Sequence, residues 1–211
     1  MQEDSLAPLP VARCGRASFG QTSANPTTFP WNTLPSCDFQ ANTPGDLLSQ
    51  GTRLRLGYDT FALHLLFVAQ DTHPWATLTE RDAPLYKEEV CEVFLDTEGD
   101  GLSYYEIEVN PNNAVLDGCM RRVRNGFRKD FRWRCAGLQT AARTFEGGWA
   151  AELSIPFDSV ANQTPEPGTR WRANFTRIDR PAGLSRELSA WSPTGRAQFH
   201  IPERFGVLEF E

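Results

Sequence analysis

The sequence has few cysteines and no long apolar run, and each shortage excludes a class of protein. An odd number of cysteines without any C-x-x-C spacing indicates neither a disulfide framework nor a zinc site. His64 interrupts the longest apolar run, which is far shorter than the roughly 20 residues that span a bilayer. Membrane insertion is therefore not expected. The five cysteines are Cys14, Cys37, Cys91, Cys119 and Cys135.

An excess of basic residues is also missing. The 211 residues include 21 Lys plus Arg and 27 Asp plus Glu, which gives a formal net charge of -6. A chain with this charge repels a phosphate backbone, so nucleic acid is not an expected partner. Residues Met1 to Asp4 lack the basic start of a secretory signal. As given, the chain is expected in the cytoplasm, or outside the cell if a signal has already been removed.

Helical periodicity is scarce, whereas alternation of apolar and polar residues recurs from about Arg53 to the end. The pattern predicts an all-β protein, an antiparallel β-sandwich of two sheets of the immunoglobulin-like or jelly-roll-like kind. The length suits a single domain over residues 1–211, in which residues 1–50 wrap the sandwich. The predicted strands are Pro10 to Cys14, Arg53 to Tyr58, Phe61 to Ala69, Val90 to Asp96, Ser103 to Asn110, Ala114 to Asp117, Leu138 to Arg143, Trp149 to Ile155, Trp171 to Asp179 and Gly206 to Phe210.

One predicted strand places a carboxylate among apolar neighbours. In Val90 to Asp96, Glu92 shares a face with Val90 and Phe94, because alternate residues of a strand point the same way. A buried charge needs a partner, which here is an arginine, a backbone group or a ligand hydroxyl. An internal ion pair and a ligand contact are thus the two alternatives for Glu92.

The following strand carries further polar groups on one face. Tyr104, Glu106, Glu108 and Asn110 alternate with apolar residues. If this strand pairs with its predecessor, Glu92, Glu108 and Asn110 converge on one shallow surface. Carboxylates and amides suit sugar hydroxyls, although a solvated sheet face is the simpler alternative.

Aromatic side chains in loops offer flat surfaces on which the C–H face of a sugar stacks. Tyr86 precedes the Glu92 strand, and Trp191 stands beside Pro193 in a late loop. Trp149 and Trp171 begin alternating strands, which indicates core positions for both.

Six segments together resemble carbohydrate-binding module family 9 and its DOMON-like relatives, with this chain as a stand-alone member. The likeness covers most of the chain from about Arg53 onward. The segments are EVCEVFLD (residues 89–96), YYEIEVN (104–110), GWAAELSIP (148–156), RANFTRID (172–179), AWSPT (190–194) and FHIPERFG (199–206).

The resemblance implies a set of sugar-binding residues. Members of that family hold a terminal sugar between two aromatic rings, which fall on Tyr86 and Trp191 here. The family glutamate falls on Glu92 and an asparagine on Asn110. A family arginine that meets the sugar falls on Glu108, so the charge at that position is reversed.

Family members also bind structural calcium. The resemblance points to the turn that follows the Glu92 strand, where Asp96, Glu98 and Asp100 supply three carboxylates. Calcium takes 6 to 8 oxygen ligands, of which a turn supplies some. A plain β-hairpin turn is the alternative.

These observations favour non-catalytic binding of a mono- or oligosaccharide. One alternative is an interaction or regulatory β-sandwich that has lost sugar binding. The other, less favoured, is a glycoside-processing enzyme, because Glu106 and Glu108 lie about 6.5–7 Å apart on a strand face. The chain has no G-x-S-x-G motif. It also has no recognisable pair of haem ligands.

Overall fold

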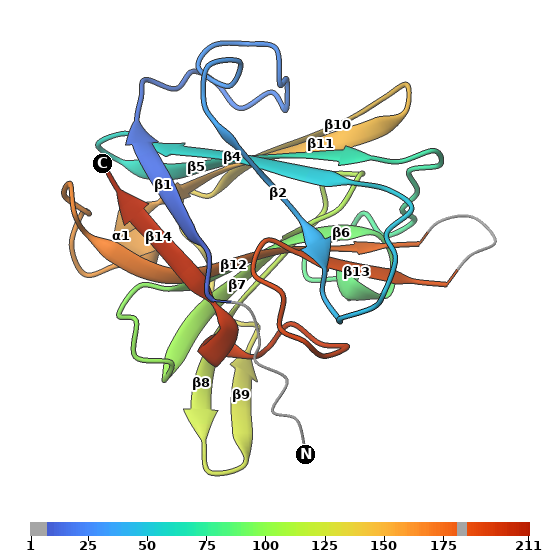
Figure 1. Ribbon diagram of the computed structural model, residues 1–211. Helices are drawn as coiled ribbons and strands as arrows, with labels where there is room; N and C mark the ends of the chain where they lie inside the picture. The colour runs from blue at the N-terminus through green and yellow to red at the C-terminus, as the bar shows by residue number, and fades with distance from the viewer. Residues whose placement is uncertain (1–7, 181–184) are drawn as a thin grey trace.

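The computed structural model describes residues 8–180 and 185–211, in which most regular structure is β-strand (Figure 1). Within these residues, no helix is long and apolar enough to cross a membrane. The elements are β1 (Val11–Arg16), β2 (Ser36–Asp38), β3 (Gln40–Ala41), β4 (Thr52–Tyr58), β5 (Ala62–Gln70), η1 (Leu85–Lys87), β6 (Val90–Asp96), β7 (Ser103–Val109), β8 (Val115–Val123), β9 (Gly126–Asp130), β10 (Gln139–Phe145), β11 (Gly148–Pro156), α1 (Phe157–Val160), β12 (Arg170–Asp179), β13 (Glu187–Ala190), η2 (Pro202–Arg204) and β14 (Gly206–Phe210).

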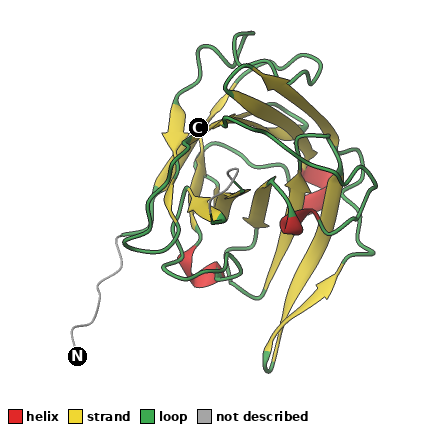
Figure 2. Cartoon of the chain, turned by 90° about the vertical axis from the view of Figure 1, so that its right-hand side faces the viewer, coloured by secondary structure: helices red, strands yellow, loops and turns green. Residues whose placement is uncertain are grey.

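The strands form one curled sheet in two halves that β1 joins. The order along the sheet is β10-β11-β5-β4-β1-β14-β12-β6-β7-β8-β9, and β13 extends from β12. The first part of β1, from Val11 to Cys14, pairs with β14, whereas Gly15 and Arg16 pair with β4. In the view of Figure 2, the strands curl around the interior.

Both pairings of β1 are parallel, so the prediction of purely antiparallel sheets is wrong for this strand. Parallel neighbours need a long connection between them. The chain supplies one between β1 and β4, and almost its whole length separates β1 from β14. The other strand pairs of the described residues are antiparallel.

The main hydrophobic core lies between the two halves of the sheet. Strand alternation sends Leu65 of β5 and Leu153 of β11 into it from one half, and Val93 of β6 and Phe175 of β12 from the other. Trp149 is also buried there, as its place at the start of an alternating strand predicted. Burial of apolar area in this core is the main stabilising contribution.

A second apolar cluster lies on the opposite face of the β12-β6-β7-β8 half. It contains Phe94, Tyr104 and Met120 from three of these strands. The late residues Phe199 and Phe205 pack on this face as well. Residues far apart in the sequence therefore cover one sheet face together, and the candidate site lies among them.

Candidate functional site

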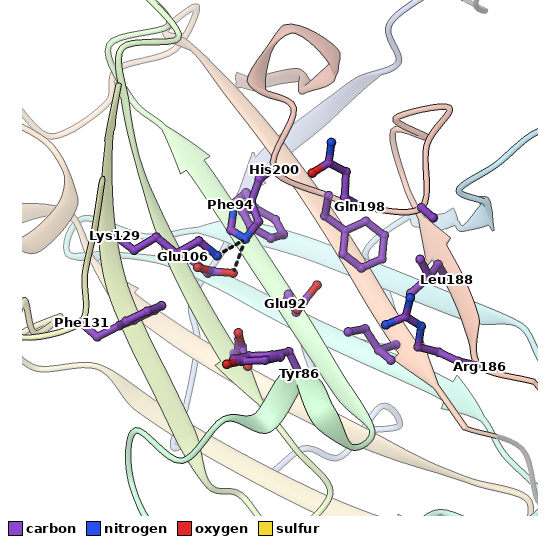
Figure 3. Close-up of a pocket in the computed structure, with 14 residues that line it drawn as sticks. Tyr86, Glu92, Phe94, Glu106, Lys129, Phe131, Arg186, Leu188, Gln198 and His200 are labelled. Carbon is purple, nitrogen blue, oxygen red and sulfur yellow. Dashed lines mark hydrogen bonds and ion pairs between the residues drawn. The ribbon is translucent and has the colours of Figure 1, made fainter. Parts of the chain in front are cut away.

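A cavity of about 250 Å³ opens on this covered sheet face (Figure 3). Its wall comprises side chains from β6, β7, β9, β12 and β13, together with η1 and the segment Ala197 to His200. Strands supply the rigid base, and the two loop segments supply the sides.

Three buried carboxyl groups lie at the base of the cavity. Glu92 of β6 stands directly opposite Glu108 of β7. Glu106 lies on the same face of β7, two residues earlier in the sequence. Carboxylate oxygens of the three lie within 4.8 Å of one another. Pairing of β6 with β7 was predicted, and the register confirms that Glu92 and Glu108 converge.

The hydrogen bonds of these carboxyl groups are incomplete. Thr176 Oγ1 donates to Glu92 Oε2 at 2.5 Å. Glu106 Oε1 lies 3.5 Å from His200 Nε2. Within the described part of the chain, the second oxygens Glu106 Oε2 and Glu108 Oε2 are buried without a hydrogen-bond partner. Buried oxygens of this kind carry a desolvation cost that a ligand can remove.

Burial raises the pKa of each of these carboxyl groups. For Glu92 the charge on Glu106 raises the pKa further, and the hydrogen bond from Thr176 opposes the rise. For Glu108 the charges on Glu92 and Glu106 add to the effect of burial. Burial also raises the pKa of Glu106, and Lys129 opposes it. The group therefore retains protons at pH values where an exposed glutamate has lost them.

The rim of the cavity carries the basic groups. Lys129 Nζ lies 2.7 Å from His200 Nε2, and the hydroxyl of Tyr104 lies 2.8 Å from His200 Nδ1. Burial and the charge of Lys129 lower the pKa of His200 to about 4, so its ring is neutral at neutral pH. Arg186 completes the basic rim from the residue before β13.

Aromatic rings form the apolar part of the wall. Tyr86 on η1 keeps 44% of its surface exposed. Phe131 and Phe199 also line the cavity. In the view of Figure 3, Tyr86 lies on one side of Glu92, and Gln198 and His200 lie on the other.

Of the five binding residues that the sequence predicted, Tyr86, Glu92 and Glu108 meet in this cavity. Asn110 is fully buried at the end of β7, where its side chain closes the turn to β8. Its Nδ2 donates to the carbonyl of Leu78, and its Oδ1 accepts from the backbone of Ala114. The structure thus places Asn110 away from the cavity wall.

Trp191 also lies away from the cavity wall and belongs to the main core, with 5% of its surface exposed. Its backbone N–H donates to the carbonyl of Phe175, and the two rings pack with their centroids 5.5 Å apart. A Cβ on Gly206 would lie 2.5 Å from the indole, so the ring rests on this glycine. This position stabilises the packing of β12 against β14.

The carboxylates of the predicted calcium turn accept hydrogen bonds from protein groups. Asp96 accepts from the backbone amides of Gly99 and Gly101 at 2.7 and 2.8 Å. Asp100 accepts from the amide of Leu102, and Glu98 accepts from a side-chain amide. The described residues include two groups of carboxylates close enough together to share an ion, and this turn is not one of them.

The second cluster of carboxylates, Asp71, Glu89 and Asp179, surrounds an arginine. Arg177 of β12 is fully buried, and its Nη2 lies 2.7 Å from Asp71 and 3.1 Å from Asp179. Glu89 joins them, and burial together with its hydrogen bond to Asp71 raises the pKa of Glu89 to about 8. An internal ion pair was one of the two alternatives for Glu92. The structure shows such a pair at Arg177 of β12 instead, with Asp71 and Asp179.

Sequence reasoning missed the groups that surround the carboxyl base, among them Lys129, Phe131 and Arg186. Lys129 belongs to β9, Phe131 directly follows it, and Arg186 directly precedes β13. The alternation pattern did not reveal either strand. A hairpin signal was present in the Asn125-Gly126 pair, which is typical of a two-residue turn.

Comparison with known proteins gives one family and several similar folds. The family model described as carbohydrate-binding family 9 matches residues 46–210. A proposed carbohydrate-binding protein from Bacteroides uniformis is 18% identical, with a TM-score of 0.80 over 97% of this chain and 100% of that one. A family 9 module from Caldicellulosiruptor kristjanssonii, solved with glucose, is 16% identical, with a TM-score of 0.71 over 96% of each chain.

A family 9 module from Caldicellulosiruptor kristjanssonii solved with cellotriose also matches, with a TM-score of 0.71 and 16% identity. That match covers 96% of this chain and 94% of the other. Among curated protein sequences, none matches this chain significantly. The structural matches establish a shared fold, and the family model extends from before β4 into β14.

Proposed function

The chain belongs to carbohydrate-binding family 9, and from this premise we propose that the cavity on the β6-β7 face binds a sugar without transforming it. One observation carries the proposal. Buried carboxyl groups at the base of the cavity stand beside the half-exposed ring of Tyr86. Ligand sites in proteins combine apolar walls with a few convergent polar groups in this way.

The wall chemistry suits the two sides of a pyranose ring. Its C–H face packs on the Tyr86 ring, and the ring's quadrupole favours the slightly positive hydrogens. Its hydroxyls meet Glu92 and Glu108, which accept hydrogen bonds when ionised and also donate when protonated. Lys129 at the rim donates to a ring or hydroxyl oxygen.

The aromatic pair of the site differs in our proposal from the clamp that the resemblance implies. That clamp joins Tyr86 to Trp191, whose indole lies in the core. Phe131 and Phe199 line the cavity with Tyr86, and we assign the second apolar wall to them. The fold likeness to a module solved with glucose and cellotriose supports a ligand of this class.

Binding without cleavage is proposed from the arrangement of the carboxyl groups. A glycosidase holds its two carboxyl groups on either side of the scissile bond. Here Glu92, Glu106 and Glu108 lie together on one sheet face at the base of the cavity. Such a group recognises a ligand from one side. After incubation of the protein with cellotriose, chromatography is expected to detect no released glucose.

Isothermal titration with glucose, cellobiose and cellotriose tests the proposal. Tyr86→Ala is expected to weaken binding by about tenfold, because an aromatic contact contributes roughly 0.5–1.5 kcal/mol beyond its buried area. Phe61→Ala is the matched control, since Phe61 is 78% exposed and lies at the β4-β5 turn. If wild-type protein binds neither these three sugars nor glucosamine, or if both variants lose affinity equally, the proposal is wrong.

A further inference from the structure

We infer that the ligand of this cavity is a sugar with one positive charge, that is, an amino sugar or an oligosaccharide that ends in one. The inference rests on the proposed function and specifies its ligand class. It depends on the charge that the cavity base would carry if all three carboxyl groups ionised, and on two buried oxygens of these groups that have no partner among the described residues.

The charges of the cavity wall balance only while the carboxyl base keeps protons. Fully ionised, Glu92, Glu106 and Glu108 would carry three negative charges, against one positive charge each on Lys129 and Arg186. The carboxyl groups are buried, whereas both basic side chains belong to exposed residues at the rim. Water weakens the effect of the rim charges on the base. A ligand with one positive charge at the base therefore allows all three carboxyl groups to ionise with their charges balanced.

Unpartnered oxygens at the base specify what such a ligand must offer. Glu106 Oε2 and Glu108 Oε2 are buried with no hydrogen-bond donor from the described residues. An ammonium group carries three donors and no acceptor. On a sugar ring it can bond both oxygens while the ring lies against Tyr86. A charge-assisted hydrogen bond of this type is about twice as strong as one from a neutral hydroxyl.

A divalent metal ion fits the same carboxyl groups less well. Two added positive charges would exceed the single unbalanced negative charge, beside Lys129 and Arg186. Calcium also requires 6 to 8 oxygen ligands. The rest of the nearby wall is largely carbon, from side chains such as Phe94, Ile178 and Leu188. A compact cationic group attached to an apolar ring matches both the polar and the apolar parts.

Proton uptake by the empty site supplies an independent signature. Burial raises the pKa values of the three carboxyl groups, so the empty base retains protons near neutral pH. An ammonium group placed beside them lowers those pKa values and releases protons on binding. The neighbouring titratable groups are Lys129, Arg186, Tyr104 and His200, and the neutral His200 does not compensate the carboxylates. A neutral sugar releases no protons by this route.

Titration calorimetry at pH 7 with glucosamine, glucose and N-acetylglucosamine tests the inference. Glucosamine is expected to bind about tenfold more tightly than glucose, and N-acetylglucosamine, whose nitrogen is uncharged, should show no gain. Glu108→Gln should abolish the preference, whereas Glu146→Gln, which removes an exposed carboxylate from the β10-β11 turn, should retain it. Circular dichroism checks that each variant is folded.

The wild-type protein gives a second measurement that needs no variant. The binding enthalpy of glucosamine should change between phosphate and Tris buffers, because released protons are taken up by the buffer. Equal or tighter binding of glucose, or binding that EDTA abolishes, would overturn the inference and leave sugar binding intact. If none of these sugars binds, and cellotriose does not bind either, the proposed function itself is wrong and the inference falls with it.

Discussion

Replacing Trp191 with alanine is expected to lower the free energy of unfolding by about 3–5 kcal/mol, the usual cost of removing a buried tryptophan side chain. The indole is 5% exposed and rests on Gly206, and Phe175 packs against it. Its removal leaves a cavity that the β-sheet backbone on either side cannot close. Sugar affinity of the folded variant should change little, because the ring does not line the binding cavity.

Two further variants serve as comparisons for the loss of stability and of sugar binding in Trp191→Ala. Trp149 is fully buried in the same core, so Trp149→Ala should cost a similar free energy. Tyr86→Ala removes a ring that is 44% exposed, and should cost much less stability while weakening sugar binding. The two tryptophan variants and the tyrosine variant thus separate core packing from ligand contact.

Urea denaturation followed by circular dichroism gives the free energies by linear extrapolation. Calorimetric titration on the folded protein gives the affinities. Because a domain of ordinary stability has about 5–15 kcal/mol to lose, the milder Trp191→Phe serves if the alanine variant does not fold. Should Trp191→Ala keep its stability within about 1 kcal/mol and lose sugar binding, the indole is a ligand contact and the reasoning from burial fails.

Three other perturbations follow from the same contacts. Arg177→Met should cost about 3–5 kcal/mol in urea denaturation, because it leaves buried carboxylates without their cation, and a loss below 1 kcal/mol would contradict the ion-pair assignment. Asp96→Asn should cost about 1.5–3 kcal/mol equally in calcium and in EDTA, since it weakens turn hydrogen bonds to a charged acceptor; a loss seen only with calcium would indicate a metal site. The empty protein should lose stability as pH rises from about 4.5 to about 8, because native Glu92, with its raised pKa, holds a proton that the unfolded chain has released. Glu92→Gln should reduce that dependence without removing it, because burial also raises the pKa values of Glu89, Glu106 and Glu108. A melting temperature that rises over this interval in both proteins would refute the sign.

Alternation along the strands predicted the faces of β6 and β7 correctly. Cys91, Val93 and Leu95 point into the main core, and Glu92 points to the other side with Phe94. Side-chain direction follows from a period of two once a strand is recognised, and neighbouring strands usually pair. The polar base of the site was therefore readable from the sequence.

The pairing of β1 and the loop contacts were not readable in this way. Strand alternation gives no information on whether a strand near one end of the chain lies beside β14 or β4. Short strands such as β9 and β13 bury few residues, so their alternation is weak. Lys129 of β9 and His200 of the segment before η2 meet over Glu106, and no local pattern records a contact between residues 71 positions apart.

Trp191 shows why an aromatic residue beside a proline was a weak guide. Its sequence neighbourhood, AWSPT, is typical of a loop, and a loop tryptophan suggests an exposed face. Strand β13 ends at Ala190, and the next residue turns inward over Gly206. Gly206, 15 positions later, has no side chain and so leaves space for the indole. This contact depends on the tertiary fold, and no local sequence pattern predicts it.

The two carboxylate clusters of the described residues differ in whether the chain itself supplies a cation. Asp71 and Asp179 are neutralised from within the chain by a buried guanidinium at 2.7 and 3.1 Å. Glu106 and Glu108 have no comparable cation at their base within the described residues, and they face a cavity instead of packed side chains. Burying carboxyl groups without a cation costs stability, which the pH dependence above would reveal. Arg177 makes the first group part of the core, whereas the second group keeps protons when the cavity is empty and, on our proposal, ionises when a ligand supplies the missing positive charge.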